Sequence, residues 1–195
     1  MLTLYGTSKT RALRPLWLLE ELGLDYTHEP TPPRHDALKT LSNLGKVPVL
    51  DADGTAITDS TAILTYLADR EGRFTAPAGT LARAEQDALT FMVLDDLEGQ
   101  LWTAAKHSFI LPEERRVPAV KETARWEFSR YVDKLMERRK GPWLMGDEMT
   151  IPDIIAVHCG GWAKSAKFET DNEDYVAYIK QGRAREAFKR AAALP

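Results

Sequence analysis

The stretch NLGKVPVLDADGTAITDSTAIL, residues 43–64, decides the fold, because two strand patterns, a turn and a helix start follow one another in it. Residues 47–50, VPVL, and residues 55–58, TAIT, are typical of short strands. The dipeptide Asp53-Gly54 lies between them and favours a tight hairpin turn. We therefore predict an antiparallel hairpin that leads directly into a helix.

Pro48 interrupts the first strand pattern. Proline has no N–H for a sheet ladder, so it belongs at strand edges, strand starts and bulges, and its preceding peptide bond is the one type that readily adopts the cis form. A bend at Pro48 would leave the backbone N–H and C=O of Val47 unpaired, where they could hold an extended, peptide-like ligand. An edge-strand proline with no ligand explains the pattern equally well.

The helix start offers a second candidate binding feature. Thr58 or Asp59 suits the capping position, and Ser60 falls in the first helical turn. Free N–H groups and the helix dipole attract a carboxylate there, the Ser60 hydroxyl adds a donor, and Asp59 could pair with an ammonium group. A zwitterionic amino-acid end fits this set, although a plain helix cap is the more frequent explanation of such a pattern.

Further strand and helix patterns surround this stretch. Residues 2–5, LTLY, predict a strand, and a helix follows from Arg11 or Ala12 to a stop at Gly23. Residues 25–30 predict another strand, residues 35–42 a short helix or turn, and residues 59–70 a helix. The order β-α-β-α-β-β-α predicts a small mixed sheet with a parallel pair and an antiparallel edge hairpin.

The rest of the chain reads as helix after a Gly- and Pro-rich stretch at residues 70–80. We expect an α/β domain at residues 1–72, a linker at 73–79 and an all-helical domain at 80–195. Thr150 and Asp153 form a capping-box pattern, which we interpret as structural. The expected helices of the second domain cover residues 81–108, 118–139, 151–164, 172–181 and 183–193.

Composition narrows the class of protein. The net charge of −3 gives no general attraction for nucleic acid or anionic membranes, and no apolar run is long enough to span a bilayer. Cys159 is the single cysteine, and the histidines lack metal-ligand spacing. These features predict a cytoplasmic protein that uses no metal and binds neither nucleic acid nor a membrane.

Hydroxyl side chains gather between the first strand and the first helix. Thr7, Ser8 and Thr10 lie in YGTSKTRALR, and each could cap the helix. A hydroxyl there would also stabilise a bound thiolate, because hydrogen bonds to the anion and a helix N-terminus lower the pKa of a thiol.

Taken together, LYGTSKTRALRPLWLLEELGLDY, NLGKVPVLDADGTAITDSTAIL and MTIPDIIAVH resemble the glutathione S-transferase family in order and separation, over nearly the whole chain. The resemblance implies a thioredoxin-like N-terminal domain and an all-helical C-terminal domain. It also implies that Val47, before a cis-Pro48, pairs its backbone with the cysteinyl part of glutathione, while Asp59 and Ser60 bind the γ-glutamyl end. Glutamate or glutamine is commoner than aspartate at the first of these two positions.

The resemblance assigns the remaining contacts of glutathione as well. Lys46, with His35 or Arg34, would face the glycyl carboxylate. Thr7 matches the position of the thiol-activating serine in serine-type members, with Ser8 and Thr10 as alternatives. Threonine keeps the hydroxyl donor and adds a methyl group beside it.

The resemblance finally implies a detoxifying transferase that joins the glutathione thiolate to an apolar electrophile, working as a homodimer with glutathione as co-substrate. Trp102, Phe109 and Trp162 are candidate walls of the electrophile pocket, although aromatic residues on helices are more often core. A non-catalytic glutathione-binding or regulatory protein is the first alternative. Another glutathione-dependent enzyme, such as an isomerase, dehalogenase or peroxidase, is the second.

Overall fold

The structure is a computed structural model that describes all of residues 1–195. Its packing groups the chain into two compact units. Residues 1–78 and 182–195 form the first unit, and residues 79–181 form the second. The α/β character of the first unit and the helical character of the second confirm the predicted fold class.

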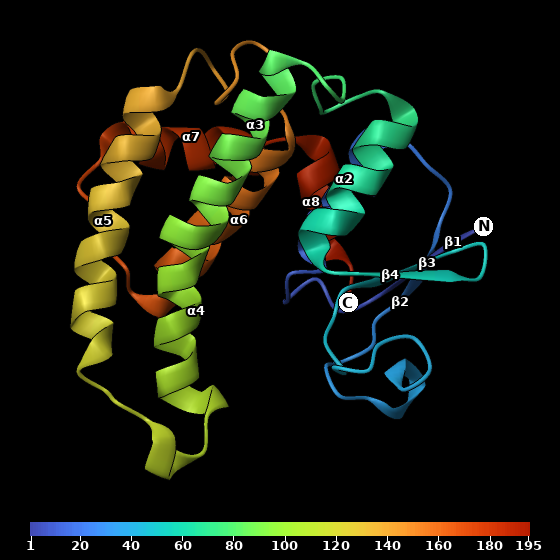
Figure 1. The fold of residues 1–195 in the computed structure, drawn as a ribbon, viewed down its shortest axis with the longest axis horizontal. Coiled ribbons are helices and arrows are strands. Elements are labelled where there is room, and N and C mark those ends of the chain that lie inside the picture. The colour runs from blue at the N-terminus through green and yellow to red at the C-terminus, as the bar shows by residue number, and fades with distance from the viewer. The chain divides into compact units, whose positions relative to one another are not determined.

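A four-stranded mixed sheet is the centre of the first unit (Figure 1). Its strands run in the order β2-β1-β3-β4, with β1 parallel to β2 and antiparallel to β3, and with β3 antiparallel to β4. The predicted pairing is therefore confirmed. The strand bounds are β1 Leu2–Tyr5, β2 Thr27–Glu29, β3 Val49–Ala52 and β4 Thr55–Thr58.

The hairpin between β3 and β4 turns at the predicted dipeptide. Asp53 and Gly54 both have positive φ, at 52° and 86°, as a tight two-residue turn requires. The pairs Ala52–Thr55 and Val49–Thr58 set the register of the hairpin. The hairpin ends at Thr58, and α2 begins two residues later at Ser60.

Helices of the first unit are α1 Leu13–Leu22, the short 3-10 helix η1 Asp36–Leu38, α2 Ser60–Glu71 and α8 Glu186–Ala193. Figure 1 shows α2 on one side of the sheet and the loop that carries η1 on the other. Gly23 ends α1 in the left-handed conformation at φ 69°, as predicted. Pro15 is tolerated because it lies in the first turn, where a helical N–H has no partner.

The last helix of the chain packs on α1. An ion pair joins Arg185 to Glu21, and the Trp17 and Phe188 rings meet edge to face at 5.1 Å between centroids. For this reason residues 182–195 group with the first unit, whereas the sequence-based division placed them in the helical domain. The division into 1–72, 73–79 and 80–195 stays a prediction about domains.

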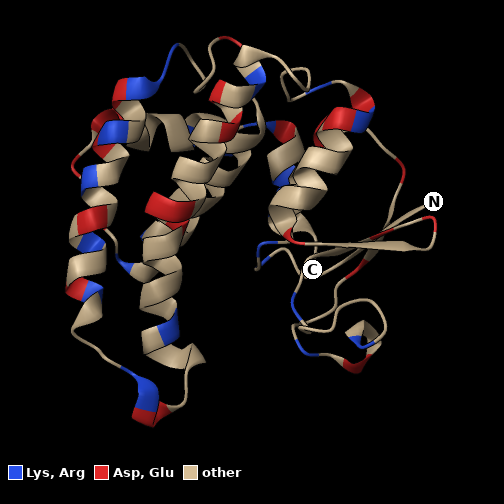
Figure 2. Ribbon diagram, viewed as in Figure 1, with Lys and Arg blue, Asp and Glu red and all other residues tan.

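The second unit is all helical. Its first segment, predicted as one helix, is a continuous run in which one π-helical stretch separates two α-helices and a second ends the run. Figure 2 shows Lys, Arg, Asp and Glu positions along the neighbouring α5. Every helix of the structure is too short or too polar to cross a membrane. The bounds are α3 Leu81–Met92, η2 Val93–Glu98, α4 Gly99–Ala105, η3 Lys106–Ile110, η4 Glu113–Arg115, α5 Val120–Arg138, α6 Ile151–Ala166 and α7 Glu173–Arg183, of which the last two residues of α7 belong to the first unit.

The predicted capping box at the start of α6 is present. The buried Asp153 carboxylate accepts hydrogen bonds from the backbone N–H groups of Thr150 and Leu144, both at 2.8 Å, and from the Tyr178 hydroxyl at 2.7 Å. Burial raises the pKa of Asp153 above its ordinary value, and these bonds oppose the rise. The carboxylate thus ties α6 to the preceding loop and to α7, which is the structural role expected from the sequence.

Candidate functional site

The three candidate hydroxyls in the loop between β1 and α1 differ in their hydrogen-bond partners. Thr10 Oγ1 donates to the carbonyl of Thr7 at 2.8 Å and accepts from the N–H of Ala12 at 3.1 Å. Ser8 Oγ donates to the carbonyl of Leu194 at 2.6 Å. The Thr7 hydroxyl makes no hydrogen bond within the protein, and its side chain is half-buried. Thr7 is therefore the hydroxyl left available for a ligand.

Gly6 brings this loop against the proline turn. A Cβ at Gly6 would lie 2.6 Å from Ala12 Cβ and 3.2 Å from Val47 Cβ, and its φ of 137° suits glycine alone. The sequence reasoning did not single out Gly6. Because Thr7 follows it directly, the close approach places the Thr7 backbone beside the turn at Val47 and Pro48.

His28 fixes the same point from the other neighbouring strand. One of its ring nitrogens lies 2.7 Å from the Gly6 carbonyl oxygen, and β2, which carries His28, pairs in parallel with β1. No sequence pattern indicated this role, since His28 has no partner set in its own neighbourhood. Its contact positions the loop and supplies no group for chemistry.

The peptide bond between Val47 and Pro48 is cis, as the sequence pattern suggested. Pro48 is buried, and β3 begins immediately after it at Val49, which pairs with Tyr5. Neither the N–H nor the C=O of the half-buried Val47 forms a hydrogen bond within the chain. These two groups lie next to the Thr7 loop and can pair with an extended ligand.

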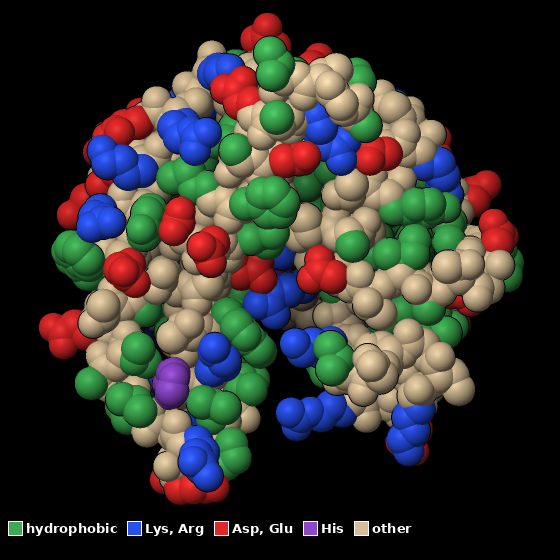
Figure 3. Space-filling view, viewed as in Figure 1, with side chains coloured by type: hydrophobic (Ala, Val, Ile, Leu, Met, Phe, Trp, Pro, Cys, Tyr) green, Lys and Arg blue, Asp and Glu red, His purple; other side chains and the backbone are tan.

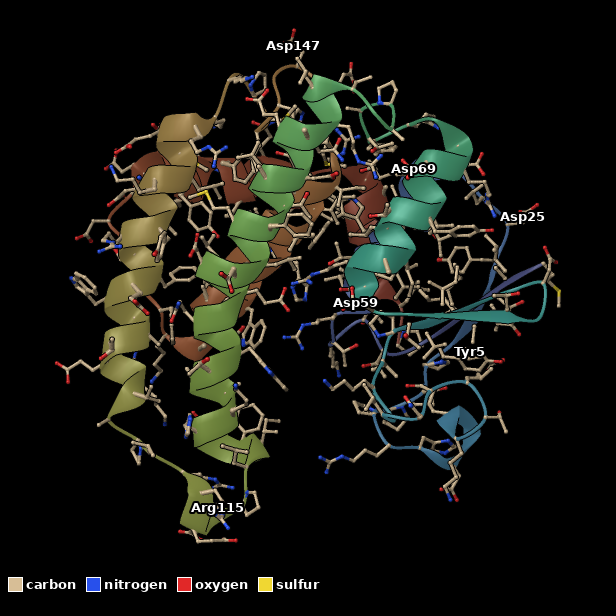
Figure 4. All side chains as sticks on the ribbon, viewed as in Figure 1. Tyr5, Asp25, Asp59, Asp69, Arg115 and Asp147 are labelled. Carbon is tan, nitrogen blue, oxygen red and sulfur yellow. The ribbon has the colours of Figure 1, made fainter.

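Asp59 caps α2 at the end of β4 (Figure 4). Its carboxylate accepts from the N–H of Thr61 at 2.7 Å and from the N–H of Ala62 at 3.2 Å. The Ser60 N–H forms no hydrogen bond inside the chain, so one donor of the helix N-terminus remains available for an anion. Asp59 also has φ 75°, an uncommon conformation for aspartate, and such residues concentrate at functional sites.

Ser60 itself is engaged by a residue that the sequence reasoning missed. Arg14, fully buried on α1, donates from Nη1 to the Ser60 hydroxyl oxygen at 3.1 Å. The available signal was an arginine within an otherwise apolar helical pattern. Such a residue needs a partner if the helix is buried, because arginine is almost never buried alone. The pair connects α1, which follows the Thr7 loop, with the N-terminus of α2.

A shallow, basic hollow of about 280 Å³ lies in the loop between β2 and β3. Its lining includes Arg34, His35 and Lys39. Figure 3 shows several Lys and Arg side chains on the lower part of the first unit, on the face in view. The Arg34 N–H donates to the carbonyl of Gly45 at 2.7 Å, which closes the loop that forms the hollow. Lys46 is exposed directly after Gly45 and is not part of the lining.

The three aromatic residues predicted for an electrophile pocket belong to the second unit. Phe109 is 67% exposed on η3, whereas Trp102 on α4 and Trp162 on α6 are half-buried. The Trp162 ring lies edge to face against His158, with 6.4 Å between the ring centroids. A shared pocket of these three residues stays a prediction. No group of three His, Cys, Asp or Glu side chains is arranged to hold a metal ion.

The four-stranded mixed sheet with its helices and the helical second unit match the fold of glutathione transferase structures. Residues 10–70 match the family model for the N-terminal domain of glutathione S-transferase. A glutathione transferase from Methylococcus capsulatus has a similar structure, with 27% identity, a TM-score of 0.82, and coverage of 98% of this chain and 97% of that chain. The family-model match and the structural similarity over nearly the whole chain support a member of the glutathione S-transferase family.

Two further comparisons point to the same family and fold. Glutathione S-transferase 3 of Caenorhabditis elegans is 29% identical over 127 residues, which cover 60% of this chain and 58% of that relative. The match therefore spans less than two thirds of the curated relative. A glutathione transferase family member from Pseudomonas fluorescens, solved with two glutathione molecules bound, shares the fold at 20% identity and a TM-score of 0.79, covering 100% of this chain and 93% of that one.

Proposed function

We propose that this protein binds glutathione and transfers its thiolate to an apolar electrophile. The observation that carries the proposal is the set of unpaired groups in the first unit, namely the Thr7 hydroxyl, the Val47 backbone groups and the Ser60 N–H. A tripeptide thiol has a matching group for each of them. Its sulfur would accept from Thr7, its cysteinyl backbone would pair with Val47, and its γ-glutamyl carboxylate would accept from Ser60.

The two ends of glutathione carry charges that suit their surroundings. The exposed Asp59 carboxylate would attract the α-ammonium group of the γ-glutamyl end. The loop closed by the Arg34–Gly45 hydrogen bond has basic residues at both of its ends in the sequence. These residues, Arg34, His35 and Lys46, would attract the glycyl carboxylate. Pro48 shapes the turn that presents Val47. The orientation of glutathione is thereby fixed, with its thiol towards Thr7.

Thr7 would act by stabilising the anion. A hydrogen bond to a charged group contributes roughly 1.5–3 kcal/mol, which is enough to lower the pKa of the bound thiol by about one to two. The thiol proton leaves to solvent, the thiolate sulfur forms a bond to the electrophilic carbon, and the leaving group departs with its electron pair. We assign the walls around the electrophile to Trp102, Phe109 and Trp162.

The extra methyl group of threonine favours one alternative, a non-catalytic protein that binds glutathione on the same fold. The two proposals share the binding groups and differ in thiol activation. A panel of electrophiles assayed with wild-type protein, Thr7→Ala and Thr7→Ser separates them. Turnover that falls about 10-fold or more in Thr7→Ala and persists in Thr7→Ser supports the transferase. Glutathione binding without any turnover supports the binding protein.

The binding step has its own test. Wild-type protein should be retained on immobilised glutathione and should bind free glutathione at millimolar concentration in calorimetry. Thr123→Ala is the control for Thr7→Ala in this assay, because Thr123 is an exposed threonine on α5 of the second unit. Absence of binding at millimolar glutathione would contradict both the transferase and the binding protein.

We further propose that the protein is a cytoplasmic homodimer, by analogy with the glutathione S-transferase family that it resembles. Light scattering coupled to size-exclusion chromatography measures the mass in solution. A mass of twice 21.9 kDa supports the dimer, and a mass of 21.9 kDa at working concentration contradicts it.

A further inference from the structure

Ser8 is tied to the C-terminal segment by two hydrogen bonds. Its hydroxyl donates to the carbonyl of Leu194 at 2.6 Å, and its backbone N–H donates to the carbonyl of Pro195 at 3.1 Å. The Ser8 side chain is 9% exposed, so these bonds are largely shielded from water. Both donors of Ser8 are therefore committed to a segment that lies 186 positions further along the chain.

Helix α8 delivers this segment by running antiparallel to α1. Arg185 pairs with Glu21 at 2.5 and 2.7 Å near the end of α1, and Phe188 meets Trp17 further back along it. Beyond α8, the chain reaches the loop that precedes α1. The numbering thus rises along α8 as it falls along α1, which places the segment after α8 beside the β1–α1 loop.

The same loop carries Thr7, the residue immediately before Ser8. The Thr7 carbonyl accepts from the N–H of Thr10 at 3.0 Å and from its hydroxyl at 2.8 Å, and the Ser8 N–H holds the other side of the same peptide. The peptide that follows Thr7 is therefore fixed at both its carbonyl and its N–H. Displacements near 1 Å at a reacting group are enough to lower catalysis strongly.

We propose that Ser8 is a positioning residue, which uses the carbonyls of Leu194 and Pro195 to hold the Thr7 hydroxyl against the glutathione sulfur. This inference rests on the proposed function. In this proposal, the segment after α8 supports thiol activation by holding the β1–α1 loop in place. The Ser8 hydroxyl is not a second activating group, because its proton is directed at Leu194.

The test compares Ser8→Ala with a chain that ends at Ala193. The first variant removes the hydroxyl bond, and the second removes both acceptors. Ser165→Ala is the matched control, since Ser165 Oγ also donates to a backbone carbonyl, that of Gly161 at 3.2 Å, on an exposed helix surface of the second unit. Thermal unfolding checks that each variant is folded.

The readout is the pKa of the enzyme-bound glutathione thiol, measured from the ultraviolet absorbance of the thiolate against pH, together with kcat/KM. We expect Ser8→Ala and the shortened chain each to raise this pKa by about 0.5 to 1 and to lower kcat/KM roughly threefold to tenfold, with glutathione affinity nearly unchanged. Ser165→Ala should match the wild type. A wild-type pH profile in both variants would overturn the positioning role.

Hydrogen exchange separates failure of this inference from failure of the proposed function. The shortened chain should lose protection at the amides of Ser8 and Thr10, and retained protection there would contradict the proposal that residues 194 and 195 hold this loop in place. A wild-type bound thiol with an ordinary pKa would instead overturn thiol activation by this protein. That result would also overturn the positioning role of Ser8. The exchange data would still test whether residues 194 and 195 hold the β1–α1 loop in place.

Discussion

Arg14 donates a hydrogen bond to the hydroxyl oxygen of Ser60 over 3.1 Å, and both side chains are buried. This pair joins α1, which carries the Thr7 loop at its start, to the N-terminus of α2. The Ser60 hydroxyl thus has a partner inside the protein, while the Ser60 N–H has none. We therefore predict separable roles for the two groups, with the hydroxyl oxygen contributing to stability and the N–H to anion binding.

Ser60→Ala should lower stability more than glutathione affinity. The substitution leaves a hydrogen-bond donor of the buried Arg14 without this acceptor, at a cost of about 1–3 kcal/mol, but it leaves the Ser60 N–H in place. Chemical denaturation measures the free energy of unfolding, and calorimetry measures affinity. A large loss of affinity with unchanged stability would show that the hydroxyl faces the ligand instead of Arg14.

Asp59 has two proposed roles, since its side chain caps α2 and its charge would attract the ammonium group of glutathione. Two substitutions distinguish these roles. Asp59→Asn keeps a side-chain acceptor for the N–H groups of Thr61 and Ala62, so stability should change by less than about 0.5 kcal/mol, while the loss of charge weakens glutathione binding. Asp59→Ala should lose about 1 kcal/mol of stability as well. Equal glutathione affinity in wild type and Asp59→Asn would exclude a charge contact with the ammonium group.

Gly6 is the position where an added methyl group should do most harm to the site. In Gly6→Ala the new Cβ would meet Ala12 Cβ at 2.6 Å, and φ 137° is unfavourable for alanine. We expect a loss of at least about 2 kcal/mol in the free energy of unfolding. Gly23→Ala is the matched control. It also has positive φ but open space around the new Cβ, and it should lose only about 1 kcal/mol. Equal losses would mean that the β1–α1 loop does not touch its neighbours closely.

The contact between α8 and α1 should weaken in acid. Burial alone would raise the pKa of Glu20, but hydrogen bonds from Arg190 and Tyr26 outweigh it and lower the pKa below its ordinary value. A lowered pKa means that the ionised carboxylate stabilises the folded state above the ordinary pKa of glutamate, and that this contribution disappears as the pH falls through the lowered value. The protection factors of the amides of residues 186–193, which correct for the intrinsic pH dependence of exchange, should therefore fall as the pH drops below about 4.5, the ordinary pKa of this carboxyl. Glu20→Gln should remove this pH dependence, and a persistent pH dependence in Glu20→Gln would assign it to another group.

Local patterns predicted the features whose partners lie close in the sequence. Asp53-Gly54 identified the hairpin, Thr150 and Asp153 identified a capping box, and Pro48 marked the cis peptide. Each of these depends on the backbone conformation of a few consecutive residues, which residue type alone restricts.

Features that depend on distant residues could not be derived in this way. By residue type alone Thr7, Ser8 and Thr10 look equivalent, and only the family resemblance favoured Thr7. They differ in the structure because the partners of Ser8 lie at residues 194 and 195. The burial of Arg14 likewise depends on Ser60, 46 positions away. Tertiary packing therefore decides which hydroxyl stays available, and the sequence had left that choice open.

The pKa of the glutathione thiol bound to the wild type and to Thr7→Ala tests the central claim most directly. We predict that the wild type lowers this pKa by about one to two relative to free glutathione, and that Thr7→Ala reverses most of this shift while glutathione still binds. Equal thiol pKa values in the two bound complexes would contradict the claim that Thr7 activates the thiol.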